Sequence, residues 1–181
     1  MLTFNKELMK KKGNHNHYNL KDIILGGQDG VVNILGLSLG VAEATNDVRV
    51  VIIAGLAGTA AESISMAAVA YTSAEASRDY YVSEEGKSPK EWRHPGWDAF
   101  IVGTSSTVGS LIPLVPFFFF AIRESMYISV AVSLVALFTV GALKAKFSIG
   151  SWQKSGIEVA TIGILAALTG YLIGKWLGVA V

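Results

Sequence analysis

Long stretches without a charged residue are the feature that most constrains this chain. No charged side chain occurs from Ala99 to Ala121, and none occurs from Tyr127 to Leu143. About 20 apolar residues are enough for a helix to cross the hydrocarbon core of a bilayer. A soluble protein can bury one such helix in its core, but not several within 181 residues. The pattern therefore predicts an all-α membrane protein.

Composition supports this fold class and excludes several kinds of chemistry. Hydrophobic residues make up 51% of the chain and charged residues 16%, whereas soluble domains carry about 25% charged residues. The net charge is +1, and no basic patch stands apart from the membrane-flanking positions, so nucleic acid is not an expected partner. The chain has no cysteine, which excludes disulfides, thiolate metal ligands and cysteine nucleophiles.

Five transmembrane helices are predicted. Their approximate limits are Asp22–Ala42, Val48–Tyr71, Trp97–Ala121, Tyr127–Leu143 and Gly156–Leu177. Residues 1–21 form a basic tail, and residues 22–181 form the five-span transporter domain. Glu43–Asp47 is expected to make a short turn, and nothing breaks the second helix before Tyr80, so it can continue as a polar extension. A short acidic connector follows at about 78–96.

The basic residues predict the orientation of these helices. With the N-terminus in the cytoplasm, the inner segments hold twelve lysines and arginines and the outer segments hold three. The outer three are Arg49, Arg123 and Lys175. Such a bias follows the positive-inside rule and places the C-terminus outside. Basic residues precede the first span, but no cleavage signal does, so this span is expected to be retained.

Two carboxylates lie inside the predicted spans. An ionisable side chain there costs about 2.5–3.5 kcal/mol on insertion scales, so its presence needs a reason. Asp29 lies roughly 10 Å below the inner surface on span one, and Glu62 lies roughly 13 Å deep on the antiparallel span two. Either one could simply hydrogen-bond a neighbouring hydroxyl group. Two carboxylates at matched depth can also share a proton or bind a divalent cation.

Span two places a thioether near the second carboxylate. Glu62 and Met66 are one helical turn apart and therefore share a face of the helix. Carboxylate oxygen beside thioether sulfur suits a transition metal better than magnesium or calcium. Asp29, Glu62 and Met66 are therefore the candidate metal ligands, although a methionine in a span is more often a packing residue.

Span three adds hydroxyl groups and prolines at a similar depth. The candidate cavity-lining residues are Thr104, Thr107, Pro113 and Pro116. Prolines free backbone carbonyls, which can line a polar cavity. A hydroxyl-rich packing face with a kink is an equally good interpretation. On span one, two four-residue glycine spacings, Gly26 with Gly30 and Gly36 with Gly40, permit close helix contact within one subunit or between two.

Several segments of the chain resemble the vacuolar iron transporter family, which includes the yeast-type vacuolar iron/manganese importer and nodulin-21-like members. The matching segments are Gly27-Gln28-Asp29-Gly30, Leu35-Gly36-Leu37, Ala54-Gly55-Leu56-Ala57-Gly58, Ser63-Ile64-Ser65-Met66-Ala67 with Tyr71, Pro113-Leu114-Val115-Pro116-Phe117 and Gly141-Ala142-Leu143-Lys144. The resemblance covers nearly the whole chain after Asp22.

This resemblance implies proton-coupled movement of ferrous iron, and in some members manganese, out of the cytoplasm by a homodimer. It implies that Asp29 and Met66 lie in the translocation path. Two features depart from the family pattern. Many members carry a glutamate where this chain has Gly58, whereas the glutamate here comes one turn later, at Glu62.

The connector between spans two and three is the second departure. Members with a cytoplasmic metal-collecting domain build it there on long acidic helices, but this connector is short. Its candidate metal-collecting residues are Glu75, Asp79, Glu84 and Glu85. Regulation that depends on a complete collecting domain is therefore not expected.

The resulting hypothesis is a dimeric transporter that exports Fe²⁺, with Mn²⁺ as a second candidate substrate, by proton antiport. Its expected partners are the metal cation, protons and membrane lipid. No resident cofactor and no enzymatic activity are expected, since no histidine or cysteine lies in a span. The expected location is a prokaryotic cell membrane, with a vacuolar membrane as the alternative. The rival hypothesis is a non-transporting scaffold or metal sensor that acts through the acidic connector.

Overall fold

The structure is a computed structural model, and it describes residues 15–85, 94–146 and 151–178. Within these residues five helices are long and apolar enough to cross a membrane. They are α2 (His15–Thr45), α3 (Val48–Glu85), α4 (Pro95–Leu114), α5 (Ile122–Lys146) and α6 (Trp152–Gly178), with a short 3₁₀ helix, η1 (Val115–Phe118), after α4. The predicted five-span all-α fold is confirmed.

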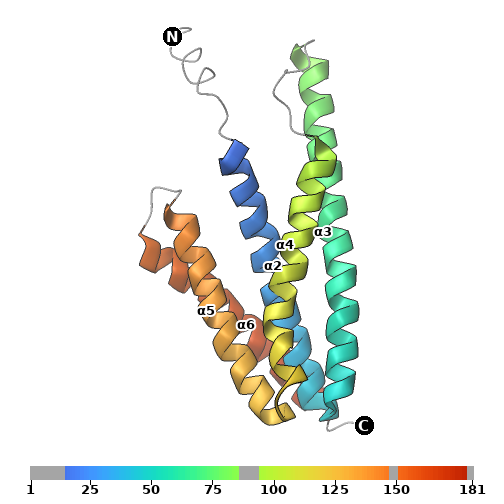
Figure 1. Ribbon diagram of the computed structural model, residues 1–181, viewed down its shortest axis with the longest axis vertical. Coiled ribbons are helices and arrows are strands. Elements are labelled where there is room, and N and C mark those ends of the chain that lie inside the picture. The colour runs from blue at the N-terminus through green and yellow to red at the C-terminus, as the bar shows by residue number, and fades with distance from the viewer. Residues whose placement is uncertain (1–14, 86–93, 147–150, 179–181) are drawn as a thin grey trace.

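Successive helices run in alternating directions (Figure 1), so that the start of α2 and the end of α6 lie at opposite ends of the bundle. The long helix α3 extends beyond its neighbours at the end where α2 begins. This extension confirms the predicted continuation of the second helix past Tyr71. Which end faces the cytoplasm stays a prediction from the positive-inside rule.

Four of the five long helices extend beyond their predicted spans, but the third was predicted too long: α4 ends at Leu114 and η1 at Phe118, before the predicted end at Ala121, because Pro113 and Pro116 interrupt the α-helix. α2 already begins at His15, so the end of the predicted tail is helical, and residues 1–14 lie outside the described part of the chain. The predicted turn Glu43–Asp47 shrinks to Asn46 and Asp47. Asn46 has a positive φ of 50°, and Asp47 accepts a hydrogen bond from the backbone N–H of Arg49 at 2.8 Å, which caps the start of α3.

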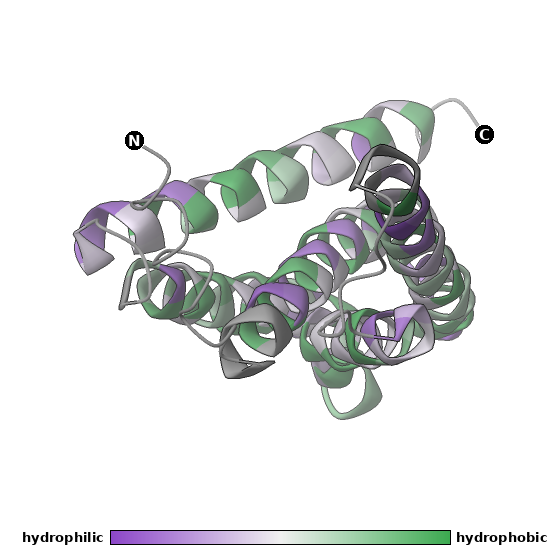
Figure 2. Ribbon diagram, turned by 90° about the horizontal axis from the view of Figure 1, so that it is seen from above, coloured by the Kyte–Doolittle hydropathy of each residue, from purple (hydrophilic) through white to green (hydrophobic). Residues whose placement is uncertain are grey.

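Large hydrophobic side chains are exposed on every long helix. Hydrophobic residues are spread along these helices (Figure 2). Ile64 is 73% exposed, Phe119 is 75% exposed and Trp176 is 80% exposed. A soluble protein rarely exposes apolar surface so widely, because water solvates it poorly. These side chains are therefore the lipid-facing surface of a multi-pass membrane protein.

Helix α2 lies at the centre and contacts each of the other four long helices, α4 and α6 most extensively. Its two glycine pairs, Gly26 with Gly30 and Gly36 with Gly40, contact different neighbouring helices. A Cβ added at Gly30 would meet the backbone of Ser106 and Ser110 on α4, and one added at Gly40 would lie 2.9 Å from the carbonyl oxygen of Gly170 on α6. Both pairs thus make close backbone contacts within one subunit.

The prolines after the middle of α4 change its geometry from α-helical to 3₁₀ at Val115. Pro113 and Pro116 are buried against α5. The hydroxyl of Ser129 donates to the carbonyl of Pro113 at 2.7 Å, and that of Ser125 donates to the carbonyl of Pro116 at 3.1 Å. Buried serines of α5 thus satisfy these carbonyls.

Candidate metal site within the membrane

Asp29 and Glu62 meet through a shared neighbour. Asn33 lies one turn after Asp29 on α2, and its side-chain amide is near enough to interact with both the Asp29 and the Glu62 carboxylates. Both carboxylates are half-buried between α2 and α3. The sequence predicted only equal depth in the membrane, whereas the structure also brings the two carboxylates close enough to interact electrostatically.

A third helix contributes a hydroxyl to the same cluster. Ser106 on α4 is fully buried, and its hydroxyl donates to Oε1 of Glu62 at 3.2 Å. It reaches this position because Gly26 and Gly30 let α4 approach the backbone of α2 closely. The cluster of Asp29, Asn33, Glu62 and Ser106, called the carboxylate cluster below, therefore joins three helices.

A second hydroxyl pair braces α3 against α4 next to this cluster. The hydroxyl oxygen of Thr107 lies 2.8 Å from that of Ser63 and 2.9 Å from the carbonyl oxygen of Gly103, within hydrogen-bond distance of both. A Cβ at Gly103 would lie 3.0 Å from the Cβ of Ala67, so the two helices nearly touch here. This close contact fixes the height of Glu62 relative to α4.

Met66 lies one turn from Glu62 on the same face of α3. The residues at this spacing, Ala54, Gly58, Glu62, Met66 and Ala70, are all half-buried, which agrees with the predicted inward face. Contact between the sulfur of Met66 and a bound metal stays a prediction. A Cβ at Gly58 would lie 2.7 Å from the side chain of Leu37, so a larger residue would need Leu37 to move.

The other candidate residues are more scattered. Thr104 is exposed and bonds only the backbone of its own helix in the contacts described, at 2.7 Å to the carbonyl of Phe100 and 3.1 Å to that of Ile101. Thr107 and the two prolines make packing contacts, as described above. Cavity lining by these four residues stays a prediction.

The acidic residues proposed to collect metal lie on the extension of α3. Glu75 and Asp79 are exposed and one turn apart, while Glu84 and Glu85 end the helix and their side chains lie outside the description. Within the described residues, no three acidic or histidine side chains are close enough together to hold a metal ion. Metal collection by this extension stays a prediction.

Sequence reasoning missed Asn33. The signal was available, because Asn33 is the only amide in the apolar stretch of span one that follows Asp29, and it lies one turn away on the same face. Ser106 belongs to a run of four hydroxyl residues, 104–107, of which only Thr104 and Thr107 were among the predicted cavity-lining residues. Which of the four would point at Glu62 depends on the rotation of α4, and that is set by its contact with the glycines of α2.

The carboxylate cluster has a simple electrostatic property. Two ionised carboxylates in a low-dielectric region repel each other and lose hydration, and both effects disappear when the pair is neutralised. One divalent cation neutralises the pair, and so do two protons. Carboxylate and amide oxygens are also suitable ligands for divalent cations such as manganese. The site can therefore exchange one kind of positive charge for another.

Comparison with known proteins identifies the family of this chain. The model of the VIT family matches residues 20–95 and 82–175. An uncharacterized protein of Methanocaldococcus jannaschii is 30% identical over 84% of this chain and 87% of its own length. Vacuolar iron transporter 1 of Oryza sativa subsp. japonica is 26% identical over 93% of each chain. Vacuolar iron transporter 1 of Arabidopsis thaliana is 23% identical over 86% of this chain and 85% of its own length. The chain belongs to the VIT family.

Proposed function

We propose that this protein is a membrane transporter that moves Fe²⁺, and also Mn²⁺, out of the cytoplasm in exchange for protons. The observation that carries the proposal is the pairing of Asp29 and Glu62 around Asn33 within the membrane. The membership in a family whose named relatives include vacuolar iron transporters supports a metal ion as the substrate.

Charge balance supports proton antiport. The carboxylate pair is least costly in the membrane when its total charge is zero, either with two protons or with one divalent cation. Metal entering from one side would displace the protons, and protons entering from the other side would release the metal. The predicted orientation puts the pair in the cytoplasmic half, where metal loaded from the cytoplasm would bind.

The ligand types support a transition metal. Asp29 and Glu62 supply hard oxygen ligands, and Met66, one turn from Glu62, would add a softer sulfur ligand. The resemblance to the family implies a glutamate at the position of Gly58, and Glu62, one turn later, would supply the carboxylate ligand instead. The amide oxygen of Asn33 is a further ligand within reach of both carboxylates.

A second copy of the chain would complete the coordination. Asn33 is exposed on α2, so the carboxylate cluster lies at the surface of a single subunit. Two carboxylates and a methionine are few ligands for one ion, and a homodimer with the two clusters facing each other would double them. Isologous contact of this kind uses the same surface on both subunits.

The length of the relatives supports a short connector in this chain. The alignment to the rice transporter spans 235 positions, although this chain has only 181 residues. The two segments matched by the family model both include residues 82–95, the region of the connector. The proposed transporter therefore works without a complete collecting domain, and metal reaches the carboxylate cluster directly from solution.

Flux into sealed vesicles tests this function. The purified protein is reconstituted into vesicles that contain a pH-sensitive dye and a metal-sensitive dye, and Fe²⁺ or Mn²⁺ is added outside. Uptake of metal should release protons from the vesicle, with about two protons per cation if the pair alternates between its neutral forms. Asp29→Asn and Glu62→Gln should abolish uptake, whereas Glu158→Gln, a change to an exposed carboxylate on α6, should not.

Three results of the flux assay would contradict different parts of the proposal. If Asp29→Asn and Glu62→Gln transport like the parent, the proposed site is wrong. If metal enters without any proton movement, the carboxylate pair binds metal but antiport is wrong. If neither metal enters while the parent is folded and dimeric, a scaffold or sensor is favoured, and removal of residues 82–91 then tests the connector.

A further inference from the structure

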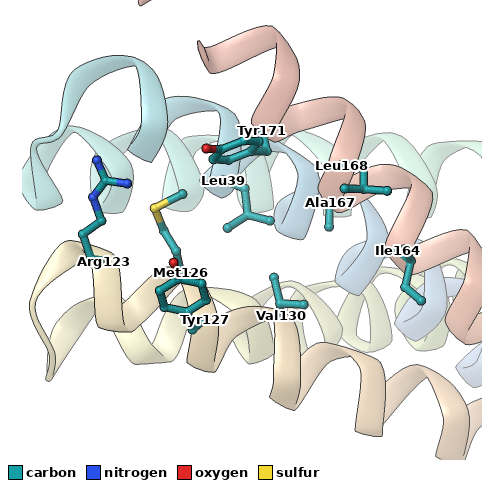
Figure 3. A pocket seen from close by; sticks show the side chains of 9 residues that line it. All are labelled: Leu39, Arg123, Met126, Tyr127, Val130, Ile164, Ala167, Leu168 and Tyr171. Atoms are coloured by element: carbon teal, nitrogen blue, oxygen red, sulfur yellow. The ribbon is translucent and has the colours of Figure 1, made fainter.

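A cavity of about 370 Å³ lies between α5 and α6 and also borders α2 (Figure 3). Its walls are mostly apolar and include Val130 on α5, Leu168 on α6 and Leu39 on α2. The carboxylate cluster uses α2, α3 and α4, so the cavity shares only α2 with it. The two sites are therefore separate.

The cavity begins at the membrane interface and runs into the hydrocarbon layer. Arg123 is the second residue of α5 and lies at one end of the cavity, and Val130 lies two turns further along, roughly 10 Å deeper. Tyr127, 75% exposed, and Trp176, 80% exposed, are on the same end of α5 and α6. Such aromatic side chains prefer the headgroup level.

Cations lie at the interfacial end of the cavity. The side chain of Arg123 is 69% exposed, and its ion pair with Glu43 is long, at 3.8 Å, so most of its five N–H donors remain available. Lys175 lies over the ring of Tyr171, which lines the cavity, at 6.0 Å from the ring centroid. Two of the three basic residues predicted for the outer side thus lie at this one location.

We propose that this cavity binds a phospholipid with an anionic headgroup. One acyl chain fills the apolar part, and Arg123 and Lys175 hold the headgroup phosphate. Water is a poor occupant of the deeper part of the cavity, because the aliphatic side chains there offer it no hydrogen-bond partners. An acyl chain suits the depth, since roughly 10 Å is about two thirds of one leaflet of the hydrocarbon core. By the predicted orientation, the lipid belongs to the outer leaflet.

Lipid binding to the purified full-length protein tests this assignment. The protein is stripped of lipid in detergent and titrated with dioleoyl phosphatidylglycerol or dioleoyl phosphatidylcholine, and bound lipid is counted by native mass spectrometry. Glycerol phosphate without acyl chains is added in a third arm, to separate binding of the lipid from binding of a free phosphate. The variants are Arg123→Gln, Val130→Phe, which fills the cavity, and Arg49→Gln as a matched control at the same end of the bundle.

The parent should bind one phosphatidylglycerol more tightly than phosphatidylcholine, by about fivefold for each cation that contacts the headgroup. Arg123→Gln should lose about fivefold of this preference, and Arg49→Gln should keep all of it. Val130→Phe should weaken both lipids. If Val130→Phe does not fold, the comparison of Arg123→Gln with Arg49→Gln still tests whether Arg123 contacts the lipid headgroup.

Three results would overturn the assignment. Equal affinity of the parent protein for both lipids would show that Arg123 and Lys175 do not select an anionic headgroup. Binding of glycerol phosphate as tight as that of the lipid would show a phosphate site without an acyl chain. If Val130→Phe leaves lipid binding unchanged but alters the fraction of dimer, a second copy of the chain covers this cavity instead.

Discussion

The contact between α2 and α6 allows a sharp test of the packing. A Cβ added at Gly170 would lie 2.7 Å from the carbonyl carbon of Gly36, and closer still to its oxygen. Favourable contacts between carbon atoms need about 3.5–4.0 Å. Gly170→Ala therefore forces α6 away from α2 by about 1 Å, because the obstacle is backbone and cannot rotate aside.

The cost follows from two opposing effects. Overpacking a well-packed interior costs about 1–3 kcal/mol, and a backbone obstacle puts this case near the upper end. Alanine gains about 1 kcal/mol over glycine in a helix. We expect Gly170→Ala to lower the free energy of unfolding by about 2 kcal/mol, which is a factor of about 30 in the unfolding equilibrium.

Reversible unfolding in mixed micelles with increasing sodium dodecyl sulfate, followed by circular dichroism, measures this quantity. Gly96→Ala is the matched control, since a Cβ at Gly96 meets nothing within 4 Å and should leave stability unchanged or raise it by up to about 1 kcal/mol. If Gly170→Ala is as stable as Gly96→Ala, the close approach of α6 to α2 is refuted.

Three further changes test other contacts. Asn33→Ala removes the amide that lies beside both carboxylates. It should weaken Mn²⁺ binding about 10- to 100-fold by isothermal titration calorimetry, because metal sites lose this much affinity when a group that orients the ligands is removed. Ser129→Ala removes the hydroxyl bound to the carbonyl of Pro113 and should lower the free energy of unfolding by about 1 kcal/mol, whereas Thr161→Ala, on an exposed face, should not. Asn46→Val puts a β-branched residue at φ 50° and should cost about 1–2 kcal/mol in the same unfolding assay, while Asn46→Gly should cost nothing.

Each of these results can contradict the structure. Unchanged metal binding in Asn33→Ala would mean that the amide does not orient the carboxylates. Equal stability of the Ser129 and Thr161 variants would mean that the serine of α5 is not needed by the proline carbonyl. A stable Asn46→Val would mean that the turn between α2 and α3 adopts another backbone geometry.

The number of helices and their transmembrane character were predictable, because each span by itself has enough apolar residues to cross the bilayer as a helix. Every one of the five contains an apolar window long enough to cross the bilayer, whatever its neighbours do. Helix ends were less predictable, since the apolar stretch of α3 stops before the helix does, whereas that of α4 continues past the end of the helix to Ala121. α3 continues to Glu85 with polar residues that carry no hydrophobic signal.

The contacts between helices were not predictable from one sequence. The depth of Asp29 and Glu62 followed from counting residues, but their shared contact with Asn33 depends on how α2 and α3 are rotated. The two glycine pairs of α2 look alike in the sequence. Only the folded chain shows that Gly30 faces α4 and that Gly40 faces α6.

The position of α2 between α4 and α6 has a consequence for biogenesis. Gly36 and Gly40 are matched to glycines of α6, the last of the five described helices to be synthesised. Until α6 enters the membrane, this part of α2 presents bare backbone to lipid or to the insertion machinery. The first span therefore reaches its final packing only after the last has been inserted, and late insertion of α6 would leave the newly made protein exposed to membrane quality-control proteases.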